Sequence, residues 1–206
     1  MVRDDEKCGT MPPPNSLTVE RMTPPQRAGT DAVVLIGHGA PATDCPPELV
    51  GELMSLEWRQ PHGRVDQAAL HARAAALDAQ IRNWPRHAGN DPYKAGLEQV
   101  AAALRPLLPT ALFAIGYNEF CRPAIAEALE QVIQQGATRV FVIPSMLTPG
   151  GLHAEHDIPK ALEAVRGAHP DVAIEYRWPF CTDDVAALLA SHVRTAMEQT
   201  VEAPRP

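Results

Sequence analysis

The sequence predicts an α/β protein: a three-layer α/β/α domain on a parallel sheet of about four strands, with a helical insertion after the first strand. Short, mostly apolar runs, typical of buried strands, recur at 31–36, 111–115, 140–143 and 172–176. Segments with helical spacing of apolar residues separate these runs. Strands that alternate with helices form parallel sheets with right-handed crossovers.

Local signals place the helices between these strands. The segment 122–135 has Pro123 in its first turn and Gly136 directly after it, which is the usual arrangement at the two ends of a helix. The helix after the third strand is expected to begin near Asp157, which we interpret as its cap. A last helix is expected to begin at Thr182.

The connection between the first two strands is longer than one crossover requires. It contains three helical patterns, separated by Pro61, Pro85 and Pro92. We therefore interpret residues 46–90 as a helical insertion, and a lid over the site is one function that such an insertion can have.

Composition and charge limit the organisation and the partners. We expect one domain at 30–200, with a disordered tail at 1–29 and a flexible tail at 201–206, because both ends are rich in proline and charge. Lys and Arg number 18 against 25 Asp and Glu, a net charge of −7. This balance argues against a nucleic-acid or anionic-membrane surface. No stretch approaches the roughly 18 apolar residues that a membrane span requires.

The cysteines argue against several kinds of site. No two of the four form a C-x-x-C pair, so zinc, an iron–sulfur cluster and a disulfide framework are all disfavoured. The N-terminal stretch also lacks the apolar core of a secretory signal. Reduced thiols without a signal sequence predict a cytoplasmic protein.

Side chains that can bind a metal follow three of the predicted strands. His38 follows the first strand, Glu119 the second and His153 the third. Because the carboxyl ends of parallel strands lie at one edge of a sheet, we expect these three side chains to meet there. Two imidazoles and a carboxylate suit divalent first-row metals such as iron, cobalt, nickel or zinc. The residues alone therefore predict a metal site, although each could also be an ordinary polar residue of a loop.

The loop around His153 contains further candidates. Gly150 and Gly151 allow the backbone to approach a bulky ligand closely. Glu155 and His156 follow in the same loop, where they either bind a ligand or remain exposed polar residues. The loop is therefore the richest single stretch of the candidate site.

Two segments of the chain resemble the sirohydrochlorin chelatase family of the CbiX/SirB type. They are VVLIGHG and YNEFCRPAIAEALEQVIQQGATRVFVIPSMLTPGGLHAEHDIPKAL. Family members begin with a strand that ends in a GHG-like turn. They continue with an acidic strand-end segment before a proline-started helix, and with a G-G-x-H-x-x-x-D-I-P-like loop. The same features occur here in the same order and on the expected elements.

The resemblance implies a class II chelatase, which inserts Co²⁺, Fe²⁺ or Ni²⁺ into sirohydrochlorin or a related tetrapyrrole without ATP. No cofactor is implied beyond the divalent metal substrate. His38 and His153 match the family's paired active-site histidines, and Glu119 matches its acidic partner. Short relatives form homodimers, and a single chelatase-like half without an internal repeat predicts the same here. The candidates for contact with the substrate are Arg122, Tyr117, Gly150, Gly151 and His156.

Two other functions are compatible with parts of the pattern. The same histidines can hold a metal or a tetrapyrrole for delivery without catalysis. A flavodoxin-like nucleotide or phosphate enzyme would share the fold class. It is disfavoured because the loop GHGAPATD has neither the G-x-x-x-x-G-K-[ST] nor the G-x-G-x-x-G phosphate-binding pattern.

Overall fold

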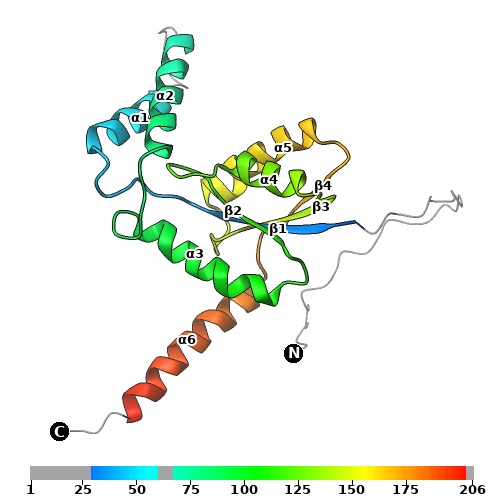
Figure 1. Ribbon diagram of the computed structural model, residues 1–206. Coiled ribbons are helices and arrows are strands. Elements are labelled where there is room, and N and C mark those ends of the chain that lie inside the picture. Colours follow the sequence, from blue (N-terminus) through cyan, green and yellow to red (C-terminus); the bar gives the residue numbers. More distant parts are fainter. Residues whose placement is uncertain (1–28, 60–66, 203–206) are drawn as a thin grey trace, which may run out of the picture. The chain divides into compact units, whose positions relative to one another are not determined.

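The computed structural model describes residues 29–59 and 67–202 (Figure 1). The tails expected at 1–29 and 201–206 lie almost wholly outside these ranges. Residues 29–178 form one compact unit, and the described part of a second unit is residues 179–202. Among the described residues, no helix combines the length and the apolar character needed to cross a membrane.

The centre of the first unit is a parallel sheet of four strands in the order β2-β1-β3-β4. In the middle of the sheet, Val34 lies opposite Ala114 on one side and Val142 on the other. The predicted parallel sheet is therefore confirmed. The strands are β1 (Asp31–Gly37), β2 (Leu112–Tyr117), β3 (Arg139–Pro144) and β4 (Ala173–Tyr176).

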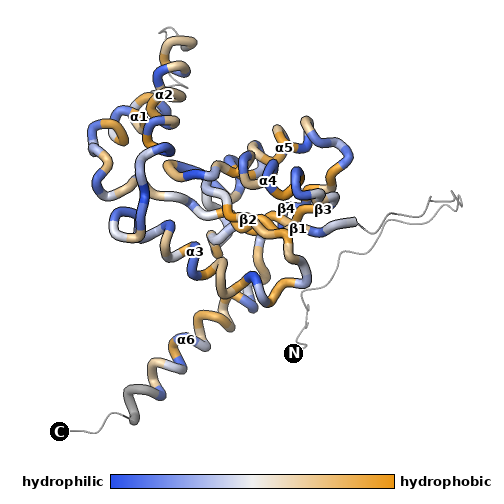
Figure 2. Tube along the Cα trace, in the orientation of Figure 1, coloured by the Kyte–Doolittle hydropathy of each residue, from blue (hydrophilic) through white to orange (hydrophobic). Residues whose placement is uncertain are grey.

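Two helices cover one face of this sheet, α4 (Ile125–Gln134) and α5 (Ile158–Ala168) (Figure 1). Every second residue of β1 points into the main core beneath them, where the helices supply leucine, isoleucine and valine. Much of the sheet is coloured as hydrophobic in Figure 2 because side chains of the strands are buried on both faces.

The opposite face is covered by α3 (Pro92–Leu104), which is followed by a short 3-10 turn, Arg105–Leu107. Leu97 of α3 packs in one buried cluster with Leu35 of β1 and Tyr117 of β2. With helices on both faces, the structure has the predicted three-layer α/β/α arrangement.

The connection from β1 to β2 contains two further helices, α1 (Pro47–Arg59) and α2 (Gln67–Arg82). They pack against each other through a second apolar cluster, which includes Leu53 of α1 and Leu77 of α2. Phe120, from the loop after β2, belongs to the same cluster. The helical pair is therefore attached to the edge of the sheet where the strands end.

The last helix, α6 (Thr182–Glu202), is the described part of the second unit and begins where the sequence predicted it. Along it Leu188, Leu189, Val193 and Met197 are each more than half exposed. An isolated helix with an apolar side is seldom stable in water, so the sequence of α6 is that of a helix which packs against another surface.

Candidate metal centre

The structure brings together the three side chains that the sequence places at strand ends. His38, Glu119 and His153 each offer one ligand atom, and these atoms all lie within 4.8 Å of one another. The two imidazole rings are 4.5 Å apart between centroids and nearly perpendicular, at 88°. The side chains are half-buried, so that a small ion can reach them from solvent. Two nitrogens and one carboxylate oxygen that converge in this way are a set of donors that could hold a divalent metal ion.

Strand order explains why these three residues meet. The chain runs from β1 to β2 on one side and then returns to β3 on the other side of β1. Such a reversal opens a crevice at the carboxyl ends of the strands, and ligands of open α/β sheets bind there. His38 and Glu119 directly follow β1 and β2, and His153 lies in the connection after β3.

The second glycine of the GHG turn, Gly39, is required for a steric reason. The amide of Glu119 donates a hydrogen bond of 2.9 Å to the carbonyl of His38, which draws the ends of β1 and β2 together. Gly39 has a φ of +93°, and a Cβ at this position would lie 1.9 Å from the carbonyl oxygen of Glu119. Only glycine fits such an approach at a positive φ. Gly39 therefore allows the two metal-binding loops to touch.

The ring of His38 is held with one nitrogen free for a ligand. Its Nδ1 lies 2.8 Å from the carbonyl oxygen of Gly39. A carbonyl oxygen only accepts, so Nδ1 donates and the Nε2 lone pair of the neutral ring remains available. The backbone amide of His38 donates to the hydroxyl of Tyr93 on α3 at 2.7 Å, which fixes the turn from the other side.

The ring of His153 has partners on both sides. Its Nε2 is 3.3 Å from Oε1 of Glu119, and its Nδ1 is 2.6 Å from Oδ2 of Asp157. His153 and Asp157 are the two ends of a short π-helical turn that leads into α5. The expectation that Asp157 caps α5 is wrong, because its side chain makes no cap hydrogen bond and turns back to the histidine.

Two arginines, neither of them predicted, hold the loops of the candidate site through hydrogen bonds to backbone carbonyls. Arg82, at the end of α2, donates to the carbonyl oxygens of Asn118 at 2.8 Å and Cys121 at 2.9 Å. Arg86 donates to the carbonyl of Ala40, 2.8 Å away, and to that of Phe120. The end of the helical insertion thus holds the backbones of the loops that carry His38 and Glu119. No local sequence pattern indicates these long-range contacts.

Beneath these loops lies a small buried network. Arg86 forms an ion pair with Asp91, and their side chains are 7% and 1% exposed. The thiol of Cys121 donates to Oδ2 of Asp91 at 3.2 Å. Burial raises the pKa of the Cys121 thiol to about 11, so this cysteine stays protonated at neutral pH.

The other predicted substrate contacts lie in different surroundings. Tyr117 is fully buried in the cluster beneath α3, and burial raises the pKa of its hydroxyl. The Tyr117 ring is therefore part of the core and is not available for contact with a substrate. Helices cover both faces of the sheet, so even a residue at the end of a strand can be buried. Arg122 is exposed and lies 3.1 Å from Glu127.

The loop after β3 remains open to solvent. Gly150 and Gly151 are exposed, and the amide of Gly150 donates to Glu155 at 2.8 Å. His156 is also exposed, outside the group of three convergent ligands. Glu155 therefore shapes the glycine loop, while His156 stays a prediction for substrate contact.

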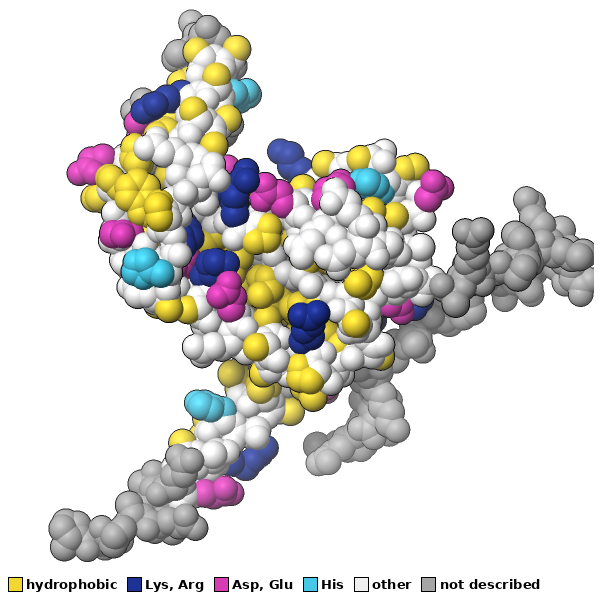
Figure 3. Space-filling model, viewed as in Figure 1, with side chains coloured by type: hydrophobic (Ala, Val, Ile, Leu, Met, Phe, Trp, Pro, Cys, Tyr) yellow, Lys and Arg dark blue, Asp and Glu magenta, His cyan; other side chains and the backbone are white. Residues whose placement is uncertain are grey.

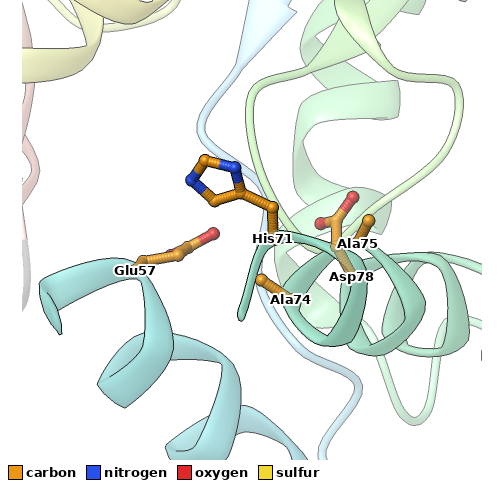
Figure 4. Close-up of a pocket in the computed structure, with 5 residues that line it drawn as sticks. All are labelled: Glu57, His71, Ala74, Ala75 and Asp78. Carbon is orange, nitrogen blue, oxygen red and sulfur yellow. The ribbon is translucent and has the colours of Figure 1, made fainter. Parts of the chain in front are cut away.

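Two hollows lie on the described surface, one between α1 and α2 and one beside Asn118 and Asp157. One, of about 390 Å³, is lined by Glu57 of α1 together with His71 and Asp78 of α2, and Figure 4 shows Glu57 reaching toward the His71 ring. Burial raises the pKa of Glu57, and the negative charge of Glu119 raises it further.

The second hollow, of about 420 Å³, lies between the starts of α4 and α5. Asn118, Asp157 and Lys160 are among its lining residues. Basic side chains on the face in Figure 3 are scattered instead of gathered in one patch. The candidate site thus combines a metal-binding group with adjacent space for a larger ligand.

Comparison with known proteins agrees with this picture. The CbiX family model matches residues 88–196, which is more than half of the chain. The chain belongs to the CbiX family. Glu119 and His153 lie inside the matched region, and His38 lies before it, so the assignment of His38 rests on its position in the structure.

Named relatives of this chain are chelatases. The sirohydrochlorin ferrochelatase of Priestia megaterium is 32% identical over 94 residues, which cover 44% of this chain and 35% of that protein. The sirohydrochlorin cobaltochelatase of Methanococcus maripaludis is 43% identical over 53 residues, or 26% of this chain and 36% of that protein. The chain thus covers about a third of each of these relatives.

Two solved structures of similarly named proteins also align with this chain. A CbiX protein from Marinobacter aquaeolei VT8 aligns over 82% of this chain and 98% of its own, with a TM-score of 0.49 and 16% identity. The sirohydrochlorin chelatase SirB from Bacillus subtilis subspecies spizizenii, in complex with cobalt, aligns over 73% of this chain and 43% of its own, with a TM-score of 0.44 and 19% identity.

Proposed function

We propose that this chain binds a divalent metal ion, Co²⁺ or Fe²⁺, between His38, Glu119 and His153 and inserts it into sirohydrochlorin without ATP. The observation that carries this proposal is the meeting of three ligand atoms within 4.8 Å at the ends of three strands. The names of the relatives, a ferrochelatase and a cobaltochelatase, supply the metals and the macrocycle. Ni²⁺ and other tetrapyrroles stay predictions from the resemblance.

The reaction has three physical requirements that these residues can meet. The metal must lose part of its hydration shell, two pyrrole N–H protons must leave, and the nitrogen lone pairs of the macrocycle must point at the metal. Three protein ligands leave open coordination positions, which the macrocycle nitrogens can occupy. The carboxylate of Glu119 offsets the charge of the divalent ion.

The histidines have a second possible task. A neutral imidazole nitrogen with a free lone pair can accept a proton, so each ring can take up a pyrrole proton once the metal has left it. The rings of His38 and His153 face each other edge to face at 4.5 Å, which places two acceptors beside one metal position. The number of acceptors equals the number of protons released.

The surroundings of the metal can hold a substrate that carries carboxylates. Lys160 lines the hollow beside Asp157, and Arg122 is exposed in the loop after Glu119. Arginine and lysine bind carboxylates by charge-assisted hydrogen bonds. The exposed Gly150–Gly151 loop leaves room for a flat macrocycle to approach the histidines. These contacts, with His156, complete the proposed substrate site.

An anaerobic chelation assay tests the proposal. Wild-type protein incubated with sirohydrochlorin and Co²⁺ should change the absorption spectrum of the macrocycle with turnover. His38→Ala and His153→Ala should each lower the rate by about 10²- to 10⁴-fold, because each removes a ligand and a proton acceptor. His169→Ala is the matched control, because His169 lies at the C-terminal end of α5, where its ring pairs with Glu130 of α4.

The outcomes separate the possible functions. Unchanged rates in both histidine variants would contradict the assignment of the site. Binding of metal or macrocycle that saturates at one equivalent without turnover would instead favour a non-catalytic delivery protein. The expected homodimer stays a prediction, which sedimentation of the wild-type protein checks independently of activity.

A further inference from the structure

The side chain of Asp157 contacts a proposed metal ligand, His153, without being one of the three convergent ligands itself. Its Oδ2 lies 2.6 Å from Nδ1 of His153, whereas Nε2 on the opposite side of the ring is 3.3 Å from Glu119. The two carboxylates therefore lie at the two nitrogens of one imidazole. Asp157 is 42% exposed and makes no capping bond to α5, so this contact is its main interaction.

This contact determines where the proton of a neutral ring lies. An ionised carboxylate can only accept a hydrogen bond, and Nδ1 is closer to Asp157, at 2.6 Å, than Nε2 is to Glu119, at 3.3 Å, so the single proton of a neutral ring lies on Nδ1. The Nε2 atom then carries a lone pair and faces an oxygen of Glu119, which is also an acceptor. Two acceptors at 3.3 Å repel each other unless a cation lies between them. The hydrogen bond to Asp157 thus prepares the Glu119 side of the ring for a metal ion.

Asn118 contacts the same ring nitrogen and competes with Asp157 for it. Its Nδ2 lies 2.8 Å from Nδ1 of His153. An amide nitrogen donates, so without Asp157 this contact favours a lone pair on Nδ1 and the proton on Nε2. The backbone carbonyl of Asn118 is in turn held by Arg82 at 2.8 Å. The ring is therefore oriented by groups from the loop after β2 as well as from the start of α5.

We infer that Asp157 is a positioning residue for the proposed chelatase: it fixes His153 as the Nδ1–H tautomer, with Nε2 directed at the metal position. Carboxylates that orient a metal-binding histidine raise its basicity, and their loss typically costs about 10- to 100-fold in metal affinity. The role of this orientation in metal insertion rests on the proposed function. The tautomer itself is a property of the metal-free protein and can be measured without any assay of chelation.

The first test is therefore spectroscopic. Long-range ¹H–¹⁵N spectra of the metal-free protein, labelled with ¹⁵N-histidine, should show His153 as the Nδ1–H tautomer. In Asp157→Ala the proton should move to Nε2, where Glu119 can accept it. Glu163→Ala removes an exposed carboxylate from α5 that pairs with Arg166, and it should leave the spectrum unchanged. The same tautomer in wild type and in Asp157→Ala would overturn the inference.

The second test measures metal binding directly. Asp157→Ala should weaken Co²⁺ binding by about 10- to 100-fold, while Asp157→Asn should recover part of the loss because its amide oxygen still accepts from Nδ1. In the chelation assay the KM for Co²⁺ should rise by a similar factor, with kcat at saturating Co²⁺ changed much less. Circular dichroism of each variant checks that it folds like the wild type.

The two proposals can fail separately. A wild-type protein that binds Co²⁺ but never inserts it would contradict the chelatase function, while the tautomer and the loss of affinity in Asp157→Ala would still support the positioning role. An active wild type whose affinity for Co²⁺ is the same in Asp157→Ala would retain the function and eliminate the positioning role.

Discussion

Two polar networks meet at the carboxyl ends of the strands, and they use similar side chains in opposite ways. The inner network is Arg86, Asp91 and Cys121, and the outer network is His38, Glu119 and His153. The inner side chains are buried and directed at backbone carbonyls and at one another. The outer side chains are half-buried and converge on a point that no described protein donor occupies.

The difference shows what separates a structural polar cluster from a site in this fold. In the inner network an ion pair is almost wholly removed from water, and the bonds of Arg86 to Ala40 and Phe120 fix the two loops above it. In the outer network Nδ1 of each imidazole contacts a protein oxygen, which leaves Nε2 for the proposed metal position. Residue type alone does not distinguish the two networks. They differ in whether the polar atoms have all found partners within the protein or keep lone pairs that a ligand can use.

Breaking the inner network should have the largest effect on stability. Arg86→Met leaves the carboxylate of Asp91 buried without its partner, and the loss of one member of a buried pair costs about 3–5 kcal/mol of unfolding free energy. Urea denaturation should show this change. Arg73→Met, which breaks the exposed pair with Glu52, is the matched control and should change the unfolding free energy far less, because water screens an exposed ion pair.

Equal costs for these two arginine variants would show that the inner network is not what holds the loops. If Arg86→Met folds, it should also bind Co²⁺ more weakly than Arg73→Met does, because the carbonyls of Ala40 and Phe120 lose their common donor. Wild-type affinity in the folded variant would mean that the outer network is independent of the inner one.

The contact between the two metal-binding loops can be changed by a single methyl group. Gly39→Ala places a Cβ where the carbonyl of Glu119 now lies, 1.9 Å away, and adds strain at a positive φ. Gly136 has nearly the same φ of +95°, but a Cβ there meets nothing within 4 Å. Gly136→Ala should therefore cost only the backbone strain, about 1–3 kcal/mol.

The difference between these glycine variants isolates the steric contact. Gly39→Ala should lose more stability than Gly136→Ala and should also bind Co²⁺ more weakly, since the ends of β1 and β2 must separate. Thermal unfolding and a Co²⁺ titration of both variants make the comparison. Equal losses of stability with unchanged Co²⁺ affinity would show that the close approach does not position the ligands.

Much of the fold and the meeting of the three candidate ligands could be predicted from the sequence because both follow from one rule of topology. Apolar strands that alternate with helices form a parallel sheet, and polar side chains at the strand ends then meet at one edge. His38, Glu119 and His153 needed no further information. The family resemblance, which supplied the metal and the macrocycle, was confirmed by the family model.

The supporting residues could not be predicted because their contacts are long-range or depend on local geometry. Arg82 and Arg86 reach the site only through the packing of α1 against α2, which no local pattern specifies. Asp157 reads as a cap in the sequence, and only the π-helical turn directs it to His153. Tyr117 is the reverse case: it was predicted to contact the substrate, but α3 covers the end of its strand and buries its side chain.

The smallest expected effect concerns the proton of Cys121 in the inner network. Burial raises the pKa of this thiol from about 9 to about 11. A group whose pKa is higher in the folded state stabilises the fold below its unfolded pKa, and this contribution is lost as the pH rises through the folded value. Stability should therefore fall from pH 9 upward, by on the order of 2 kcal/mol by pH 11.

Cys121→Ala tests this assignment through the slope of stability against pH. Tyr117 and Tyr176, whose pKa values are also raised by burial, contribute only from about pH 10 upward, so the interval from pH 9 to 10 reports on the thiols. Burial also raises the pKa of Cys45, so Cys45→Ala is measured beside Cys121→Ala. Cys121→Ala should reduce the slope in this interval more than Cys45→Ala does, while Cys181→Ala, at a partly exposed thiol, should keep it. An unchanged slope in Cys121→Ala would place the titrating group elsewhere and leave the inner network without a pH-sensitive member.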